Sequence, residues 1–297
     1  MKRVLVTGAG GFIGRQTLKP LIDYGFDVVA IRRSKDAQDI SGVRTVQLDL
    51  CDDDAVDGTL NDLQATHLLH LAWAPVVSGL WTAPENVEWV RVSLNFAEAF
   101  AKSGGKHVIG VGSCGEYDWS GGLCVEDITA LKPSTLYGAC KHGLHTVMEA
   151  MLQNYGVGTA WGRIFFVYGP GEHPSRLGAS VAQALLNGKI AECTHGQQLR
   201  DYAHVADVAN GLAALANSEL SGAYNIASGR AIRVKDLILA LGEAAGRPDL
   251  IKLGAREAPA YEPPLIVSDM SKTFSALDWR PKFSLELGAK DVINNMH

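Results

Sequence analysis

The chain has 297 residues, of which 47% are hydrophobic and 20% charged, and its formal net charge is −5 at pH 7. This apolar content is enough for a sizeable core. The negative balance gives no basic footprint for nucleic acid or for an acidic membrane surface, so neither is expected as a partner. Five scattered cysteines show no metal-ligand spacing, and their odd number argues against a disulfide framework. With no signal peptide and no membrane-spanning run expected, we predict a cytoplasmic protein without a metal.

The first predicted elements are a strand, a glycine-rich turn and a helix. Residues 2–7 form an apolar run, residues 8–14 read Gly-Ala-Gly-Gly-Phe-Ile-Gly, and an amphipathic segment continues to about residue 24. This order is the context that a dinucleotide-binding loop requires. The free N–H groups at the helix N-terminus would then meet the phosphates.

Each glycine of this Gly-x-x-Gly-x-x-Gly spacing has a role in such a loop. Gly8 would permit the tight turn, Gly11 would let the backbone approach the pyrophosphate, and Gly14 would let the helix pack closely on the sheet. The alternative is a glycine-rich turn with no ligand. We expect the cofactor to contact Gly8, Gly11, Phe12, Ile13 and Gly14.

The second predicted strand, residues 27–31, ends in two arginines, Arg32 and Arg33. An acidic residue at this strand end would accept a hydrogen bond from the ribose 2′-hydroxyl of NAD(H), whereas an arginine would pair with a 2′-phosphate. Because no carboxylate is present there, the sequence predicts that NADP(H) is favoured over NAD(H). The alternative is a solvated basic turn.

The third and fourth predicted strands supply the rest of the expected cofactor site. Residues 45–50 end in an Asp-Leu pair, in which Asp49 either contacts the adenine or caps the helix that follows. In the fourth strand, residues 67–73, the small Ala72 would let the backbone pass close to the cofactor. The residues expected to line the cofactor site here are Asp49, Leu50, Leu71, Ala72 and Trp73.

A tyrosine and a lysine form a candidate catalytic pair. Lys141 follows Tyr137 by four positions, a spacing that occurs nowhere else in the chain. On a helix this spacing places both side chains on one face, one turn apart. A nearby ammonium favours the phenolate, so Lys141 would lower the pKa of Tyr137 and make it a general acid/base. The pair alone is weak evidence, since such a spacing also arises by chance.

The motifs follow one another in an order that resembles a known superfamily. Those described above are joined by Ser113 four residues before Tyr117, Arg163-x-Phe-x-Val-Tyr-Gly-Pro170, Arg200-Asp201-Tyr-x-His204-Val-x-Asp207 and Leu277-Asp-Trp279-Arg-Pro281. Over nearly the whole chain, this ordered set resembles the extended short-chain dehydrogenase/reductase superfamily, also called the NAD-dependent epimerase/dehydratase family.

Strands and helices alternate up to about residue 165, which predicts an α/β fold with a doubly wound, Rossmann-like parallel sheet. The resemblance implies a smaller, discontinuous C-terminal domain as well. We therefore predict a dinucleotide-binding domain of residues 1–166 and 204–229, and a substrate-binding domain of residues 167–203 and 230–297. It also implies a homodimer through helices around residues 85–103 and 137–155.

The resemblance implies that Ser113, Tyr137 and Lys141 are catalytic. Ser113 would hold the substrate oxygen while Tyr137 transfers the proton, and Tyr137 and Lys141 would also contact the cofactor. Family dehydratases carry an Asp-Glu pair directly after the serine, but Cys114 and Gly115 stand here, and they cannot replace an acid/base pair. The bifunctional epimerase-reductases carry a cysteine where Gly115 stands. Simple hydride transfer remains.

The substrate class is inferred from basic residues in the second half of the chain. By the resemblance, Arg200 and Arg256 lie where the family holds the pyrophosphate of a nucleotide sugar, and Arg176 would join them. Cys114 and Glu116 are expected to contact the substrate.

We therefore predict an NADP(H)-dependent enzyme that reduces a keto group, at C4, of a nucleotide-activated deoxysugar. The alternative is a nucleotide-sugar 4-epimerase with tightly held NAD(P). A non-catalytic cofactor-binding sensor would not need to keep the three catalytic candidates. Phe166 replaces the asparagine that the family usually places at the substrate, which leaves the substrate contacts open.

Overall fold

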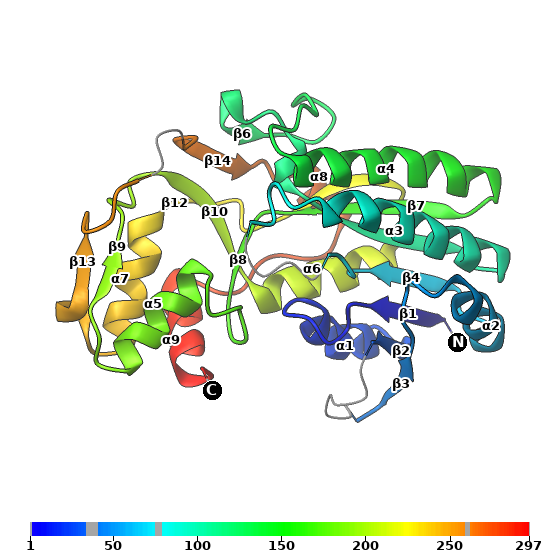
Figure 1. The fold of residues 1–297 in the computed structure, drawn as a ribbon, viewed down its shortest axis with the longest axis horizontal. Helices are drawn as coiled ribbons and strands as arrows, with labels where there is room; N and C mark the ends of the chain where they lie inside the picture. The colour runs from blue at the N-terminus through cyan, green and yellow to red at the C-terminus, as the bar shows by residue number, and fades with distance from the viewer. Residues whose placement is uncertain (1, 34–40, 75–78, 259–261, 297) are drawn as a thin grey trace.

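The computed structural model describes residues 2–33, 41–74, 79–258 and 262–296. Its largest element is a sheet of seven parallel strands in the order β11-β7-β5-β4-β1-β2-β3 (Figure 1). This order is that of a doubly wound sheet extended by one strand, so the predicted Rossmann-like α/β fold is confirmed. The strands are β1 (Arg3–Thr7), β2 (Asp27–Arg32), β3 (Val43–Gln47), β4 (His67–His70), β5 (His107–Ser113), β7 (Gly158–Ile164) and β11 (Gly222–Ile226).

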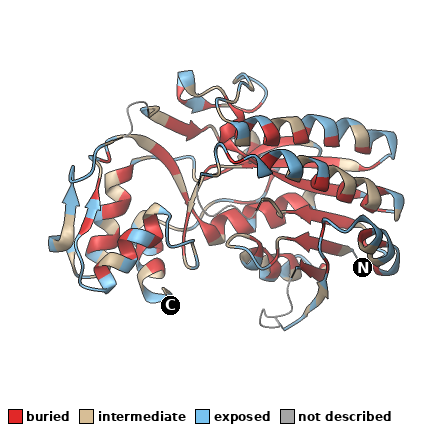
Figure 2. Cartoon of the chain, viewed as in Figure 1, coloured by how far each residue is buried: buried red, intermediate tan, exposed pale blue. Residues whose placement is uncertain are grey.

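Alternate side chains of the central strands enter two separate apolar cores. In β1, Val4 and Val6 join one core and Leu5 joins the other, and in β2 the neighbours Val28 and Val29 divide in the same way. Figure 2 shows the strands of this sheet as largely buried. Because both faces are covered, these strands read as continuous apolar runs rather than as an alternation.

Two layers of helices cover the sheet. Helices α1 and α6 share the core of Val4 and Val6, whereas α2, α3 and α4 share the core of Leu5 (Figure 1). Side-chain caps begin three of them, because Asp52 accepts a hydrogen bond from the Ala55 nitrogen, Thr135 from the Gly138 nitrogen and His204 from the Ala206 nitrogen. The helices are α1 (Gly14–Asp23), α2 (Asp53–Leu63), α3 (Glu85–Lys102), α4 (Leu136–Asn154) and α6 (Val205–Ser218).

The remaining elements form two smaller sheets and a separate group of helices. The mixed sheet has the order β12-β10-β14-β6, with β8 paired to β10, and β9 pairs with β13. Its strands are β6 (Leu123–Cys124), β8 (Phe166–Tyr168), β10 (Leu199–His204), β12 (Ala231–Arg233) and β14 (Leu265–Ser268), and the pair is β9 (Ala191–Cys193) and β13 (Ile251–Leu253). The helices are α5 (Leu177–Leu186), α7 (Val234–Ala244), α8 (Ser271–Ala276) and α9 (Leu285–Asn294), and the 3₁₀ turns are Cys114–Glu116, Trp119–Gly121 and Pro248–Leu250.

A third apolar core joins α5, α7 and α9, which lie together at one end of the molecule (Figure 1). Its buried members, such as Leu185, Leu237 and Val292, all come from residues 167–203 and 230–297. This supports the predicted domain division, which stays a proposal, since β6 from the N-terminal part pairs with β14. None of the helices in the described segments is both long enough and apolar enough to cross a membrane.

Acid should destabilise the fold through buried histidines. His67 is 4% exposed, and burial, with help from His107, lowers its pKa to about 4. Between about pH 6.5 and pH 4, His67 is therefore protonated in the unfolded chain but neutral in the folded chain. Stability is lost as the pH falls through this range. From pH 7.5 to pH 5, this residue alone should remove about 2 kcal/mol from the free energy of unfolding.

Urea unfolding at the two pH values measures this loss. His67→Gln should show a smaller loss, because its side chain does not titrate. The matched control, His173→Gln, changes an exposed histidine and should behave as the unmodified protein does. An equal loss in His67→Gln and in the unmodified protein would show that His67 does not carry the effect.

Candidate active site

The glycine turn after β1 is required by close backbone contacts. Gly8 has a φ of +66°, and a Cβ there would lie 2.9 Å from the Ala72 nitrogen. A Cβ at Gly14 would lie 2.2 Å from the Gly8 carbonyl oxygen. Gly8 therefore brings the turn against the end of β4, and Gly14 lets α1 begin directly on the turn.

A cleft of about 700 Å³ lies beside this turn, at the C-terminal ends of β1, β2 and β4. A helix N-terminus, a glycine turn and apolar walls are what a dinucleotide needs, so these residues fit such a cofactor. The cleft brings together the predicted cofactor residues Gly8, Gly11, Arg32, Arg33, Asp49, Leu50, Leu71, Ala72 and Trp73.

Three of the predicted cofactor residues differ in their surroundings. Arg32 ends β2 and is 7% exposed, whereas Arg33 is exposed. Asp49 lies beyond the end of β3, and its Oδ1 accepts a hydrogen bond of 3.0 Å from the Cys51 nitrogen. The sequence leaves two roles open for Asp49, a contact with the adenine and the N-cap of α2. The N-cap of α2 is Asp52, so Asp49 does not have that role.

A second cavity, of about 360 Å³, reaches the same glycine turn through Phe12 and Ile13. Ser113, at the end of β5, and Tyr137, in the first turn of α4, both line it. Parallel sheets bind ligands at this edge. The other walls are mostly apolar, and they include the aromatic residues Trp81, Phe165 and Phe166.

The two catalytic candidates on this cavity interact. Burial holds the pKa of Tyr137 above its ordinary value, and a hydrogen bond with Ser113 opposes that shift. The Ser113 hydroxyl also accepts a hydrogen bond of 3.1 Å from the Gly115 nitrogen. The phenol is therefore protonated near neutral pH in this arrangement.

Lys141 lies one turn along α4, and its ammonium has two neighbours outside that helix. It donates a hydrogen bond of 2.9 Å to the Val111 carbonyl oxygen and lies 3.7 Å from the centre of the Trp73 ring. Burial dominates the pKa of Tyr137 here, so the expected lowering of that pKa by Lys141 stays a prediction. Burial also lowers the pKa of Lys141 itself to about 7, against the opposing charge of Glu116.

Sequence reasoning missed Trp81, which packs on Tyr137. The Tyr137 nitrogen donates a hydrogen bond of 3.1 Å to the Trp81 carbonyl oxygen, and the two rings meet edge to face at 5.5 Å. Trp81 lies in the segment before α3, so no motif or helical spacing pointed to it.

The three predicted substrate arginines do not share one site. Arg176 lines the second cavity. Arg200 is buried, and its Nη2 lies 3.0 Å from Glu262 Oε1, so its predicted role toward the substrate is corrected to an internal ion pair. Arg256 is exposed and is not among the described residues that line the cavity, so the structure does not place it at the substrate either.

The other two residues predicted to contact the substrate, Cys114 and Glu116, also lie in different places. Cys114 lines the second cavity, and burial raises the pKa of its thiol, so it is not a thiolate. Glu116 is fully buried, and its carboxylate is held by Arg163 and Trp161. The prediction that Glu116 contacts substrate is therefore wrong, because a side chain with these partners has no access to the cavity.

Several solved structures and curated proteins that are similar to this chain are named as 4-epimerases of UDP-sugars. The UDP-glucose 4-epimerase of Thermus thermophilus, in complex with NAD, has a TM-score of 0.87 at 25% identity, over 99% of this chain and 98% of that one. MoeE5 in complex with UDP-glucose and NAD has a TM-score of 0.80 at 28% identity, over 98% and 97%. The UDP-glucuronate 4-epimerase of Thermodesulfobacterium geofontis is 25% identical, over 98% of this chain and 94% of that protein.

The predicted preference for NADP(H) is wrong, since the cofactor in these similar structures is NAD. Arg32 and Arg33 do line the cleft, as the sequence suggested. A guanidinium can, however, stack on an aromatic ring or donate to hydroxyl groups as well as pair with a phosphate. Two arginines at a strand end therefore do not require a 2′-phosphate.

A family model covers most of the chain. It describes the NAD dependent epimerase/dehydratase family and matches residues 4–227. That range includes the glycine turn, Ser113, Tyr137 and Lys141, and the whole seven-stranded sheet apart from the first residue of β1. The chain belongs to the NAD dependent epimerase/dehydratase family.

Proposed function

We propose that the protein is a nucleotide-sugar 4-epimerase that uses NAD. The observation that carries this proposal is the meeting of Ser113 and Tyr137 at a largely apolar cavity that shares the glycine turn with a dinucleotide-sized cleft. Cys114 and Gly115 follow Ser113, so the acid/base pair of a dehydratase is replaced. The similarity to proteins named 4-epimerases supports the same reaction.

The chemistry assigned to the chain is proton transfer at one sugar oxygen. Tyr137 Oη removes the proton from the substrate 4-hydroxyl and later returns it, while Ser113 Oγ holds that oxygen. When bound, NAD supplies a reversible acceptor for the hydride on the adjoining carbon. A positive charge brought close to the phenol would lower its raised pKa and allow Tyr137 to act as the base.

Two features of the cavity suit an epimerase. The apolar part of its wall, which includes Phe165, Phe166 and Val167, offers few directional hydrogen bonds, so a keto sugar can rotate there and present its other face before it regains the hydride. Arg176 is exposed at the cavity, and its guanidinium suits a phosphate of the nucleotide. The nucleotide and the sugar are the open parts of this proposal.

The experiment incubates the purified protein, supplied with NAD, with UDP-glucose, UDP-galactose and UDP-glucuronate, and follows the products by NMR. We expect the 4-epimer of at least one of them, in catalytic amounts and without net formation of NADH. In a parallel incubation with NADH and a 4-keto nucleotide sugar, stoichiometric consumption of NADH, together with no isomerisation in the first incubation, would show a reductase instead.

We also propose a homodimer that buries the outer faces of α3 and α4. These helices pack side by side, and Val87 on α3 is 57% exposed and Val147 on α4 is 49% exposed (Figure 1). Light scattering at micromolar concentration should give twice the mass of one chain, because the pair would bury an isologous apolar face. Val147→Glu should shift the mass toward one chain, while Leu239→Glu on α7 should not. A monomeric unmodified protein would contradict the proposal.

A further inference from the structure

We propose that Glu116 is a positioning residue that fixes Ser113 and, through it, the approach of Ser113 to Tyr137. The inference rests on the proposed function, since it concerns the two residues assigned there to proton transfer. Glu116 has an exposure of 0% and therefore cannot touch the substrate. Any effect of Glu116 on turnover must therefore come from the residues that its carboxylate holds in place.

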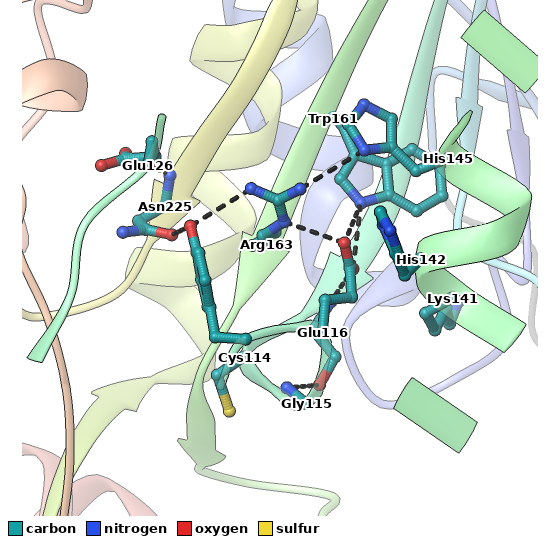
Figure 3. Close-up of polar contacts among 12 residues, drawn as sticks. Cys114, Gly115, Glu116, Glu126, Lys141, His142, His145, Trp161, Arg163 and Asn225 are labelled. Carbon is teal, nitrogen blue, oxygen red and sulfur yellow. Dashed lines mark hydrogen bonds and ion pairs between the residues drawn. The ribbon is translucent and has the colours of Figure 1, made fainter. Parts of the chain in front are cut away.

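The carboxylate of Glu116 is held on every side by donors. Its Oε1 accepts from the Ser113 nitrogen at 2.8 Å and from Trp161 Nε1 at 3.0 Å, and its Oε2 accepts from Arg163 Nε at 2.8 Å. Figure 3 shows Arg163 between Asn225 on one side and Glu116 and Trp161 on the other. A buried carboxylate is tolerated only when it is paired and hydrogen-bonded in this way.

The contact with Ser113 closes a small hydrogen-bonded box. The Ser113 hydroxyl accepts from the Gly115 nitrogen, while the Glu116 carboxylate reaches back to the Ser113 nitrogen. The Gly115 nitrogen thus holds the Ser113 oxygen, and the Glu116 carboxylate holds the backbone that carries it. The hydroxyl proton then remains available for a bond to the substrate oxygen or to Tyr137.

The backbone next to Ser113 leaves room for this carboxylate. A Cβ at Gly112 would lie 2.1 Å from Glu116 Oε1 and 2.1 Å from Trp161 Nε1. Any larger residue at position 112 would push the carboxylate and the indole away from the strand end. Gly112, Glu116 and Trp161 therefore pack closely against one another next to Ser113.

The hydrogen-bond network of Glu116 reaches the helix that carries the other catalytic candidates. Arg163 donates to the Tyr117 hydroxyl at 3.2 Å and lies 3.4 Å from His145 Nδ1. His145 belongs to α4 and stacks on Trp161, with ring centres 4.7 Å apart. Since Tyr137 stands in the first turn of α4, the Glu116 network ties the end of β5 to the helix that presents the phenol.

The test is a double-mutant cycle between Glu116→Gln and Ser113→Ala, measured as kcat and KM on the sugar nucleotide that the protein converts. A glutamine keeps the shape of the side chain but places an amide N–H2 group against the donors of Trp161 or Arg163. Because two donors then face each other, the side chain shifts and its hydrogen bond with the Ser113 nitrogen weakens. We expect kcat to fall severalfold, by less than the fall in Ser113→Ala, with KM within about threefold, as for a small misplacement of a reacting group. In the double variant, Glu116→Gln should cost no more than about threefold beyond Ser113→Ala, because both act on one hydroxyl.

A control and a second variant separate positioning from general loss of structure. Asp207 is another buried carboxylate that accepts two backbone N–H bonds, from Lys282 and Phe283, so Asp207→Asn should lower stability and leave kcat unchanged. If Glu116→Gln does not fold, Trp161→Phe removes one donor to the carboxylate and keeps the ion pair. It should lower kcat severalfold in the unmodified background and have little effect in Ser113→Ala.

The outcomes distinguish this proposal from the function on which it rests. If Ser113→Ala lowers kcat but Glu116→Gln does not, or if the two losses multiply in the double variant, the positioning role is overturned and the proposed function stands. If Ser113→Ala leaves kcat unchanged, the assignment of Ser113 fails and the positioning role fails with it. Non-additive losses confined to kcat support both.

Discussion

Tyr137→Phe should lower turnover roughly 10²-fold to 10⁴-fold, the usual worth of a general acid/base group. The change removes only the hydroxyl that moves the proton and keeps the ring that packs on Trp81. Binding of NAD, measured by calorimetry, should therefore change little. Ser113→Ala should cost less, because one neutral hydrogen bond is lost, and Lys141→Ala should weaken both NAD binding and turnover.

The matched control is Tyr155→Phe, at the C-terminal end of the same helix. Tyr155 is 42% exposed, and its hydroxyl donates to Glu98 on the surface. This variant makes the same chemical change far along α4 from the cavity, so its kcat should equal that of the unmodified protein. Near-normal kcat in Tyr137→Phe would mean that another group transfers the proton.

Asp201→Ala should destabilise the fold by about 3–5 kcal/mol, as expected when a buried, fully bonded carboxylate is deleted. Asp201 lies in β10 with an exposure of 0%. Its two oxygens accept hydrogen bonds from the nitrogens of Ser228, Gly229 and Ser268, and from the hydroxyls of both serines. Without it, these donors are left buried where β10, β14 and the segment after β11 meet.

Calorimetry should show a melting temperature lower by roughly 10 °C for Asp201→Ala, given a few degrees per kcal/mol in a chain of this size. The control is Asp62→Ala, which removes an exposed carboxylate from α2 and should change stability by less than about 0.5 kcal/mol. A melting temperature for Asp201→Ala within about 2 °C of the unmodified protein would show that the network relaxes without cost.

The parts of the molecule that the sequence predicts well are specified locally. The strand, glycine turn and helix of residues 2–24 follow from patterns within a few residues, and the structure has them as β1, the turn at Gly8 and α1. Helix α4 is different, because its expected place around residues 137–155 comes from the family resemblance and not from a local pattern. Near-continuous apolar strands between helices identify a parallel sheet without any knowledge of which strand pairs with which.

The second sheet could not be predicted, because its strands are short and pair with distant partners. Strand β10 pairs in parallel with β8 and β14 and antiparallel with β12, and β12 and β8 are three residues long. Such segments carry too few residues for a period-2 pattern. Their pairing is a property of the folded chain.

The candidate site shows the same division. The cofactor cleft gathers residues from strand ends, which a parallel sheet brings to one edge, so their grouping could be predicted. The partner of Arg200 is Glu262, and the partners of Glu116 are Trp161 and Arg163 on another strand. The members of these pairs are far apart in the sequence, so no spacing reveals them. The sequence alone therefore suggests a substrate contact for Arg200 and Glu116, although both are buried in internal ion pairs.

The central claim, that hydride leaves and returns at C4 of a nucleotide sugar, is tested most directly by isotope retention. The protein and NAD are incubated with UDP-glucose, UDP-galactose and UDP-glucuronate carrying deuterium at C4, and the products are read by NMR. The proposed epimerase should give a 4-epimer that keeps its deuterium, because a hydride held on the cofactor does not exchange with water. Exchange of the label with solvent, or the absence of any 4-epimer while the cleft binds NAD, would contradict it.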